Sequence, residues 1–415
     1  MSSESHSETL RAFSQHVNAP YVELLKRLGL DLEFVHATGA IVRDRDGRPF
    51  IDCIAGYGNL NVGHNAPEVI EAVVDELRSP RPFSWPFVGG AHARLAQRLA
   101  RLAPGELECS LIVNSGAEAV DSALKLARLA KRKPLIVAAQ GAWHGYTLGA
   151  LSVSEPSMCR SFEPLLGGVT HVPYGNAGAV EQAIQDRTGA VIVEPIQAES
   201  GAVMPPPGYL RALVEICRRK DVVLIFDEIK TGIGKTGRVF ACEHEDAVPD
   251  VLLVGKSLGG GAMPIGALIA HRRLWGAFGY SFGMSSSSGA GNAPACAAAV
   301  ATLDLLEKEQ LCGKAATHGE RLFDCLQSLA KRYPRVVTGA SGRGLLAALH
   351  TDSMKSATEI VIQCIQRGVL VMNAFCNKTR ILIEPPLCIT VSQLDTALFA
   401  IEAAVAHVAA RLDPG

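Results

Sequence analysis

Short apolar runs that end on polar residues recur through the middle of the chain. Residues 222–226 are apolar and stop on Asp227, and residues 251–254 are apolar and stop one glycine before Lys256. A third run, 190–193, stops on Glu194. Continuous apolar runs of this length are typical of strands buried on both faces. They predict a mostly parallel sheet with polar side chains at its carboxyl ends.

Helical patterns alternate with these runs. A helical segment opens at 114–118 and stops in the basic turn 131–133 before Pro134, with Val120, Ala123, Leu124 and Ala127 on one apolar stripe. Residues 209–220 form a second helical segment. Strands that alternate with helices predict an α/β fold with its ligand site at the carboxyl edge of the sheet. The short strand 111–113 and the strand 135–139 are expected to belong to the same sheet.

The first hundred residues follow a different pattern. Residues 9–30 have helical spacing, 41–52 read as a hairpin turned at Asp46 and Gly47, and 54–64 form a glycine-rich segment that contains Tyr57. Two further helical segments between 66 and 102 flank a proline-rich connection. We expect residues 1–75 and 311–415 to form the two parts of a small α+β domain, and residues 76–310 to form a large domain.

Composition narrows the class of protein. Hydrophobic residues make up 48% and charged residues 20%, as in a soluble globular protein. The net charge of −1, without a basic tract, argues against nucleic acid as a partner. Eleven cysteines lie scattered without CxxC or metal-type spacing, so we expect reduced thiols, no metal and a cytoplasmic location. The polar start has no signal-peptide pattern, and no run could span a membrane.

Asp227 and Lys256 together suggest a particular chemistry. A lysine amine can hold a carbonyl cofactor as a Schiff base, and a buried carboxylate can keep a pyridine nitrogen protonated. The pair therefore points to pyridoxal phosphate. Taken singly, Asp227 could be a helix cap and Lys256 a solvated surface lysine.

Two loops could complete such a site. The turn Ser115, Gly116, Ala117 lies between a strand and a helix start, where free N–H groups and the helix dipole favour an anion such as phosphate. After strand 135–139, Trp143 could lie flat against a heterocycle, with His144 beside it. The alternatives are a simple helix cap and a Trp packed in the core.

The chain resembles a known family at this point. The motifs are NSGAEAVDSALKLAR (114–128), GAWHGYTLGALS (141–152), VEPIQAESG (193–201), DEIKTGIGKTG (227–237), GKSLGGGAMPIGA (255–267) and GNAPACAAA (291–299). In order and spacing they resemble class III, ω-type aminotransferases of PLP fold type I, the aspartate aminotransferase-like fold. The segments 162–176, 240–245 and 383–387 most resemble the putrescine and ornithine aminotransferase branch.

The resemblance implies a role for each matching residue. Lys256 would form the Schiff base with pyridoxal 5'-phosphate, Asp227 would hold the pyridine nitrogen, and Trp143 and Ile229 would cover the two ring faces. The phosphate would lie on Ser115, Gly116 and Ala117. Further cofactor contacts are expected from His144, Glu194 and Lys230.

Ser288 stands where the family commonly has a threonine that reaches the phosphate of the neighbouring subunit. The resemblance therefore implies a homodimer with shared active sites. Tyr57, Glu199, Arg380 and Leu382 are the residues expected to meet the substrate.

Three positions depart from the family pattern. Lys230 replaces a glutamine that contacts the cofactor's phenolic oxygen, and Ala117 replaces a threonine. Leu382 replaces an arginine that anchors an α-carboxylate, and Arg380 lies two residues before it. With leucine there, we expect Glu199 to be free to receive a cation, and we expect a terminal amine, such as a diamine or a long-chain intermediate, as substrate.

Other functions stay open. An aminomutase or a decarboxylase of the same fold would share these motifs, and an α-amino acid aminotransferase could use Arg380. A nicotinamide-dependent oxidoreductase is disfavoured because the Ser115 turn lacks GxGxxG. A catalytically silent binding protein is disfavoured because both Lys256 and Asp227 are present.

Overall fold

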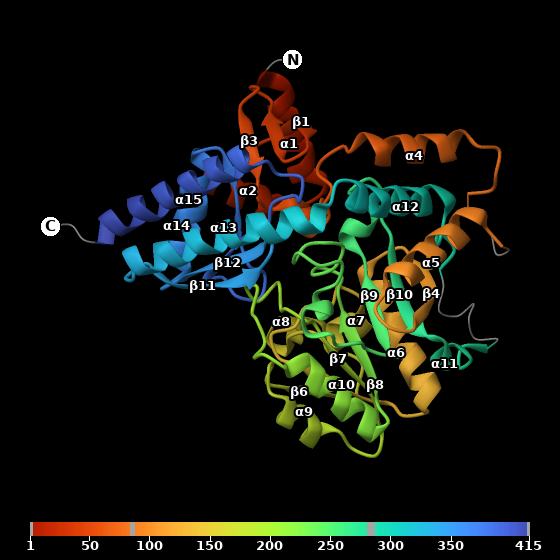
Figure 1. The fold of residues 1–415 in the computed structure, drawn as a ribbon. Helices are drawn as coiled ribbons and strands as arrows, with labels where there is room; N and C mark the ends of the chain where they lie inside the picture. Colours follow the sequence, from red (N-terminus) through yellow and green to blue (C-terminus); the bar gives the residue numbers. More distant parts are fainter. Residues whose placement is uncertain (1–2, 84–87, 280–286, 413–415) are drawn as a thin grey trace.

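A seven-stranded sheet forms the centre of the structure, a computed structural model that describes residues 3–83, 88–279 and 287–412. Its strand order is β4-β10-β9-β8-β7-β5-β6 (Figure 1). Strand β10 is antiparallel to both neighbours, and the other described pairs are parallel. The strands are β4 (Leu107–Val113), β5 (Leu135–Ala139), β6 (Val169–Val172), β7 (Thr188–Val193), β8 (Val223–Asp227), β9 (Val251–Val254) and β10 (Gly266–His271). The mostly parallel sheet predicted from the sequence is confirmed.

Helices cover both faces of this sheet. Alternate residues of each strand contribute to two separate apolar clusters, which is why the strands read as continuous apolar runs. One cluster contains α6, α7 and α11, and the other contains α5, α10 and α12. Their bounds are α5 (Gly90–Leu102), α6 (Gly116–Lys131), α7 (Leu148–Ser152), α10 (Tyr209–Lys220), α11 (Arg272–Trp275) and α12 (Ala293–Lys308).

Strand β4 is longer than the sequence predicted. The apolar run covers only 111–113, but the strand begins at Leu107, which is 2% exposed and pairs with His271. Glu108, Cys109 and Ser110 break the apolar pattern because this end of the strand is only partly covered. Pairing with β10, rather than burial, holds these residues in the sheet.

A second sheet joins the two ends of the chain. The expected hairpin is present as β2 (Ile41–Asp44) and β3 (Pro49–Asp52), with β1 (Phe34–Thr38) beside β2. Strand β13 (Val369–Leu370) pairs in parallel with β3. The N-terminal helices are α1 (Ser3–His16) and α2 (Ala19–Leu28), and the glycine-rich segment holds only the short, irregular α3 (Ala55–Gly58), followed by α4 (Pro67–Arg78).

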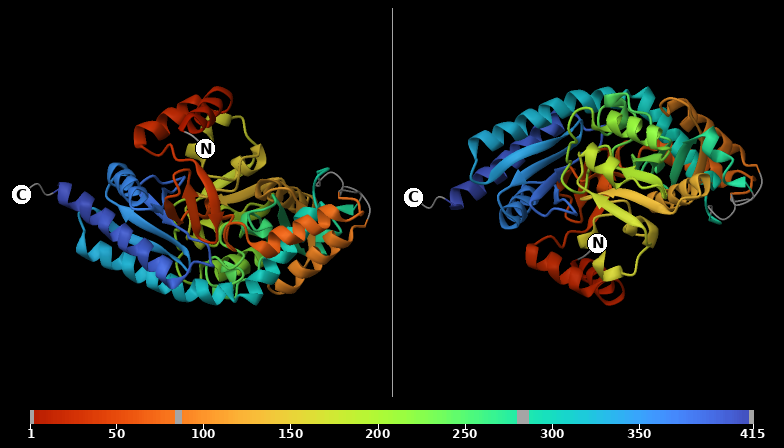
Figure 2. Two further views of the ribbon diagram at one scale, coloured as in Figure 1. Left: turned by 90° about the horizontal axis from the view of Figure 1, so that it is seen from above. Right: turned by 90° about the horizontal axis from the view of Figure 1, so that it is seen from below.

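A third sheet is made by the C-terminal residues, in the order β11-β12-β15-β14. Figure 2 shows the helices α13, α14 and α15 beside it, on a different side of the molecule from α1 and α2. The elements are β11 (Val337–Arg343), β12 (Leu346–Thr351), β14 (Met372–Asn373), β15 (Arg380–Ile383), α13 (Leu311–Arg332), α14 (Met354–Gln366) and α15 (Val391–Leu412). The domain boundaries expected at 75 and 310 stay predictions.

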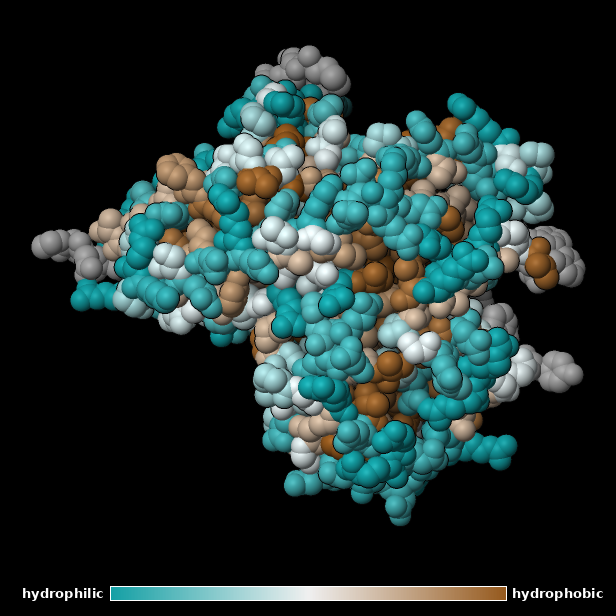
Figure 3. Space-filling view, viewed as in Figure 1, coloured by the Kyte–Doolittle hydropathy of each residue, from teal (hydrophilic) through white to brown (hydrophobic). Residues whose placement is uncertain are grey.

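Two short helices, α8 (Pro156–Cys159) and α9 (Ala177–Ala183), complete the α/β part of the chain. The face seen in Figure 3 is mostly hydrophilic, with apolar residues between the charged ones. Among the described residues, every helix is either too short or too polar to cross a bilayer.

Candidate active site

A pocket opens at the carboxyl end of the central sheet, where the sequence predicted it. The turn after β4, the loops after β5 and β7, and the ends of β8 and β9 all contribute side chains. Eleven of its lining residues were among the predicted site residues: Ser115, Gly116, Ala117, Trp143, His144, Glu194, Glu199, Asp227, Ile229, Lys230 and Lys256. The predicted cofactor residues of the described chain thus come together, except for Ser288.

Lys256 lies two residues after the end of β9, behind Gly255. Its backbone φ of 44° lies in the left-handed region, which residues other than glycine rarely adopt. Such backbone strain is concentrated at functional sites. Burial lowers the pKa of its amine, and the positive charge of Lys230 lowers it further, against the charges of Glu199 and Asp227. The lowered pKa favours the neutral amine, the form that can attack a carbonyl carbon or accept a proton.

Asp227, the last residue of β8, is held from two sides. One carboxylate oxygen accepts the backbone N–H of Ile229 at 3.0 Å, and the other lies 2.6 Å from Nδ1 of His144. Burial lowers the pKa of His144, but the hydrogen bond and charge of Asp227 outweigh it, so the net shift is upward. The imidazole of His144 therefore orients the Asp227 carboxylate in the pocket. The raised pKa of His144 favours an imidazolium paired with the ionised carboxylate.

Glu194 connects two of the loops that form the pocket. Its oxygens accept the backbone N–H of Trp143 at 2.9 Å and of Ala198 at 3.2 Å. Burial raises its pKa to about 7. These contacts show Glu194 fixing the loop that carries Trp143 and His144.

The turn before α6 offers an anion site. Ser115 caps the helix, with its hydroxyl accepting the N–H of Glu118 at 3.2 Å. A side chain at Gly116 would lie 2.8 Å from Ile229, so glycine lets these two elements pack closely. The first N–H groups of a helix have no partner within it, and together with the dipole they suit a dianionic phosphate.

Two aromatic rings, Trp143 and Tyr146, line the pocket, and Phe375 packs against both from outside the described lining. Trp143 packs edge-to-face against Tyr146, with ring centroids 4.9 Å apart, and against Phe375 at 4.6 Å. The sequence analysis identified Trp143 but not the other two rings. Phe375 lies between the C-terminal strands β14 and β15, far from the motifs along the chain, and no local pattern marks it.

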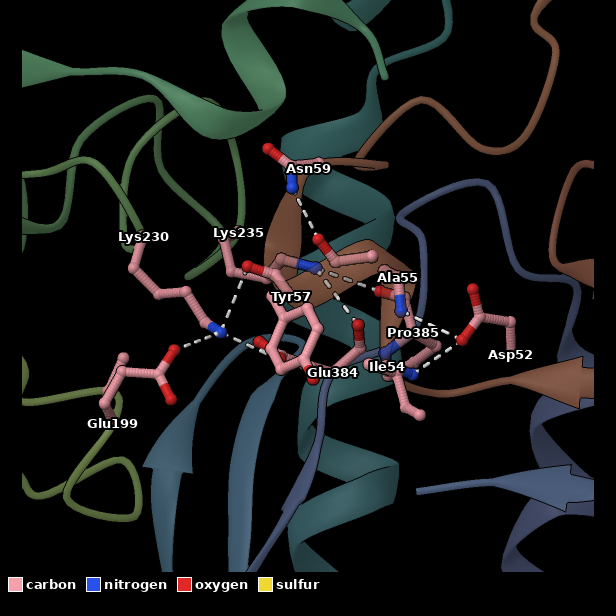
Figure 4. A network of polar contacts seen from close by, with 12 residues as sticks. Asp52, Ile54, Ala55, Tyr57, Asn59, Glu199, Lys230, Lys235, Glu384 and Pro385 are labelled. Carbon is pink, nitrogen blue, oxygen red and sulfur yellow. Dashed lines mark hydrogen bonds and ion pairs between the residues drawn. The ribbon is translucent and has the colours of Figure 1, made fainter. Parts of the chain in front are cut away.

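Lys230 lies between two carboxylates (Figure 4). Its Nζ donates to Glu199 at 2.9 Å, to Glu384 at 2.8 Å and to the carbonyl oxygen of Tyr57 at 3.2 Å. Burial opposes the charged amine, but the charges of Glu384 and Glu199 outweigh burial and raise the pKa of Lys230. The sequence analysis missed Glu384, which stands directly before the Pro-Pro pair.

The expectation of a free Glu199 is wrong. The absence of an arginine at position 382 does not leave the carboxylate unpaired, because the side chain of Lys230 reaches it from the loop after β8. Burial alone would raise the pKa of Glu199, but the charges of Lys230 and Lys256 and the hydrogen bonds from Lys230 and Phe375 together lower the pKa below its ordinary value. The ionised form of Glu199 is therefore favoured, and it is paired with Lys230.

Four predicted residues, Tyr57, Arg380, Leu382 and Ser288, lie outside the described pocket lining. Tyr57 is 51% exposed, and its carbonyl oxygen accepts a hydrogen bond from Lys230. Leu382 is 1% exposed and packs in an apolar cluster with Ile196 and Ala198. Arg380 packs its stem against Gly201, and its Nε and Nη1 have no hydrogen-bond partner among the described residues. Ser288 is exposed. The roles of these residues toward substrate or a second subunit stay predictions.

Comparison with protein families agrees with this site. A family model described as aminotransferase class-III matches residues 28–405. The chain belongs to the class III aminotransferases. The enzyme therefore carries out transamination that depends on pyridoxal phosphate, and the aminomutase and decarboxylase alternatives are not favoured.

Solved structures support the same assignment. Ornithine aminotransferase from Toxoplasma gondii ME49 is 30% identical, with a TM-score of 0.90 over 97% of this chain and 95% of that one. An (S)-enantioselective ω-transaminase from Thermomicrobium roseum is 27% identical, with a TM-score of 0.90 over 97% and 98%. Acetylornithine aminotransferase from Elizabethkingia anophelis is 28% identical, with a TM-score of 0.79 over 93% and 98%. The aminotransferase thus has PLP fold type I, as predicted.

The residues of the pocket suit pyridoxal phosphate. A second structure of the T. gondii enzyme, also 30% identical, holds PLP at partial occupancy in its active site. In this aminotransferase the pocket combines a lysine of lowered pKa, an aspartate held by His144 and a helix N-terminus for phosphate. A carbonyl, a pyridine nitrogen and a phosphate are the groups that these three features would bind.

Proposed function

We propose that this class III aminotransferase takes the amino group from a terminal primary amine and passes it to a carbonyl acceptor. The observation that carries this proposal is the absence of a guanidinium from the described pocket lining. The lining contains two lysines. Lys256 forms the Schiff base and moves the proton in this proposal, and Lys230 is paired with two carboxylates. A substrate α-carboxylate would find no bidentate partner in this pocket.

The proposed roles follow from the contacts. Bound pyridoxal phosphate supplies an electron sink beside the substrate carbon. Lys256 removes the proton from that carbon and later returns a proton, because its lowered pKa leaves the amine free to accept one. Asp227, oriented by His144, holds the proton on the pyridine nitrogen. The N–H groups at Ser115, Gly116 and Ala117 hold the phosphate.

A substrate profile tests this proposal. Purified aminotransferase loaded with cofactor is mixed in single turnover with butylamine, alanine or glutamate, and the loss of the visible cofactor band is followed. We expect the terminal amine to react faster than either α-amino acid. The variants Leu382→Arg and Arg380→Ala identify which side chain determines the preference between terminal amines and α-amino acids. If glutamate or alanine is the best donor, terminal amines are inert and Arg380→Ala abolishes the activity, Arg380 is the anchor and the proposal fails.

We propose that the working unit is a homodimer with shared active sites. The resemblance of Ser288 to a threonine that reaches a neighbouring phosphate supports this, as does the exposure of Ser288. We expect light scattering to report a dimer. We expect Ser288→Ala to weaken the retention of the cofactor while the protein stays dimeric. A monomer that is fully active at assay dilution would contradict the shared site.

We also propose a cytoplasmic location. All eleven cysteines are free thiols, and five of them are buried residues of the apolar core around the sheet. A reducing compartment would keep them in this state. Fractionation of cells that produce the protein, followed by immunoblotting, tests this location.

A further inference from the structure

The ammonium group of Lys230 has no donor left for a ligand. It carries three N–H bonds, and it makes three hydrogen bonds, to Glu199, Glu384 and the Tyr57 carbonyl (Figure 4). The Lys230 side chain is only 4% exposed. Lys230 therefore does not replace the glutamine that contacts the cofactor in the family. It does not replace the arginine that binds a substrate carboxylate either.

Both carboxylates are paired with Lys230, although Oε2 of Glu384 has no hydrogen-bond partner among the described residues. Glu384 is 0% exposed, so a substrate does not reach it. Glu199 lines the pocket, but it binds Lys230 and also accepts a backbone hydrogen bond from Phe375. A substrate ammonium at Glu199 would compete with Lys230 for this carboxylate and would place a second positive charge close to the buried Lys230 ammonium, which is unfavourable.

The rings of Trp143 and Tyr146 form an apolar part of the pocket lining, and Phe375 packs against both from outside the described lining. Trp143, Tyr146 and Phe375 contact one another edge-to-face. Tyr146 belongs to the pocket lining and is 72% exposed, so it stands where the pocket meets solvent. An aliphatic or aryl chain that covers these rings removes apolar area from water, whereas a charged end gains no partner there.

We propose that Lys230 and Glu384 hold Glu199 in a closed ion-pair cluster, and that the pocket therefore selects amines whose far end is uncharged and apolar. This inference rests on the proposed transamination of terminal amines and narrows it. Among the substrates considered from the sequence, it favours a long-chain amine over a diamine. Lys230 and Glu384 are specificity-determining residues in this scheme, since they act through Glu199.

Three amines of equal length test the selection. Hexylamine, 1,6-diaminohexane and 6-aminohexanoate differ only in the far end. We expect kcat/KM of the first half-reaction to be at least about tenfold higher for hexylamine than for either charged amine. A diamine or amino acid that equals or exceeds hexylamine overturns the inference. If none of the three discharges the cofactor band while alanine or glutamate does, the proposed function itself fails.

Variants test the cluster. Lys230→Met removes the ammonium, keeps most of the aliphatic side chain and releases Glu199, so we expect the ratio of diaminohexane to hexylamine activity to rise about tenfold. The double variant Lys230→Met with Glu384→Gln also removes the buried charge of Glu384. It replaces the single variant in this test if the single variant does not fold. Lys355→Met, on the exposed face of α14, is the matched control and should leave the ratio unchanged. An unchanged ratio in the folded cluster variant contradicts the inference.

The aromatic wall has its own test. Tyr146→Ala should reduce the preference for hexylamine over propylamine by several-fold, because less apolar area is covered by the longer chain. Both amines carry the same reacting group, so a change in this ratio reports the tail and not the chemistry. An unaltered preference for the longer chain would show that the tail does not meet this wall, and would overturn that part of the inference.

Discussion

Lys256→Ala is expected to abolish turnover and the borohydride-reducible link between protein and cofactor. Lys256 lies just after β9 and lines the pocket, and burial and the charge of Lys230 lower the pKa of its amine. It would serve both as the covalent anchor and as the group that moves the proton, and the loss of a positioned acid–base group alone costs about 10²- to 10⁴-fold. Because Lys256→Ala removes both roles, we expect the loss to exceed this range and to leave no measurable turnover.

Two measurements make this result specific. Circular dichroism should show an unchanged fold, because alanine removes only the side chain. Lys355→Ala, which truncates an exposed lysine on α14, should keep both activity and the covalent link. If Lys256→Ala still gives a protein-bound cofactor after borohydride reduction, for example through Lys230, the assignment of Lys256 is wrong.

Asp227→Ala is expected to reduce the rate of the chemical step far more than cofactor binding. The carboxylate would matter most when negative charge develops on the cofactor ring, and removing such a preorganised group typically costs about 10²- to 10³-fold. The phosphate contacts at Ser115, Gly116 and Ala117 would still retain the cofactor. Single-turnover kinetics and a cofactor-binding titration measure the two effects separately.

Asp227→Asn is the matched comparison. It keeps the shape of the side chain and an oxygen for Ile229 or His144, but it removes the charge. We expect its rate to fall nearly as far as that of the alanine variant, because the charge rather than the packing is what the chemistry needs. Near-normal turnover in either variant would show that Asp227 does not hold the pyridine nitrogen.

Elements that are buried on both faces could be predicted from the sequence alone. Strand β5, strand β9 and helix α10 have the predicted bounds, and the site lies at the predicted edge of the sheet. Consecutive apolar residues are required wherever helices cover both faces of a sheet, so local composition reports the fold directly. Strand β4 was predicted too short, because pairing with β10 holds its partly exposed half in place.

The polarity of parallel strands determined much of the candidate site as well. Asp227 is the last residue of β8, and Lys256 comes two residues after the end of the neighbouring parallel strand β9, so both lie at the same edge of the sheet. The helix start at Ser115 and the loop that carries Trp143 reach that edge for the same reason. Each of these positions follows from an element next to it in sequence.

The surroundings of Glu199 were decided only by the tertiary structure. Lys230 is 31 residues from Glu199 and 154 residues from Glu384, and Phe375 comes from the C-terminal part of the chain. A lysine has a long, flexible side chain, so its position along the sequence does not determine which acceptor it meets. Glu199 could be recognised from sequence as a residue of the site. The pairing of Glu199 with Lys230 depends on how the loop after β8 packs against the segment after β15.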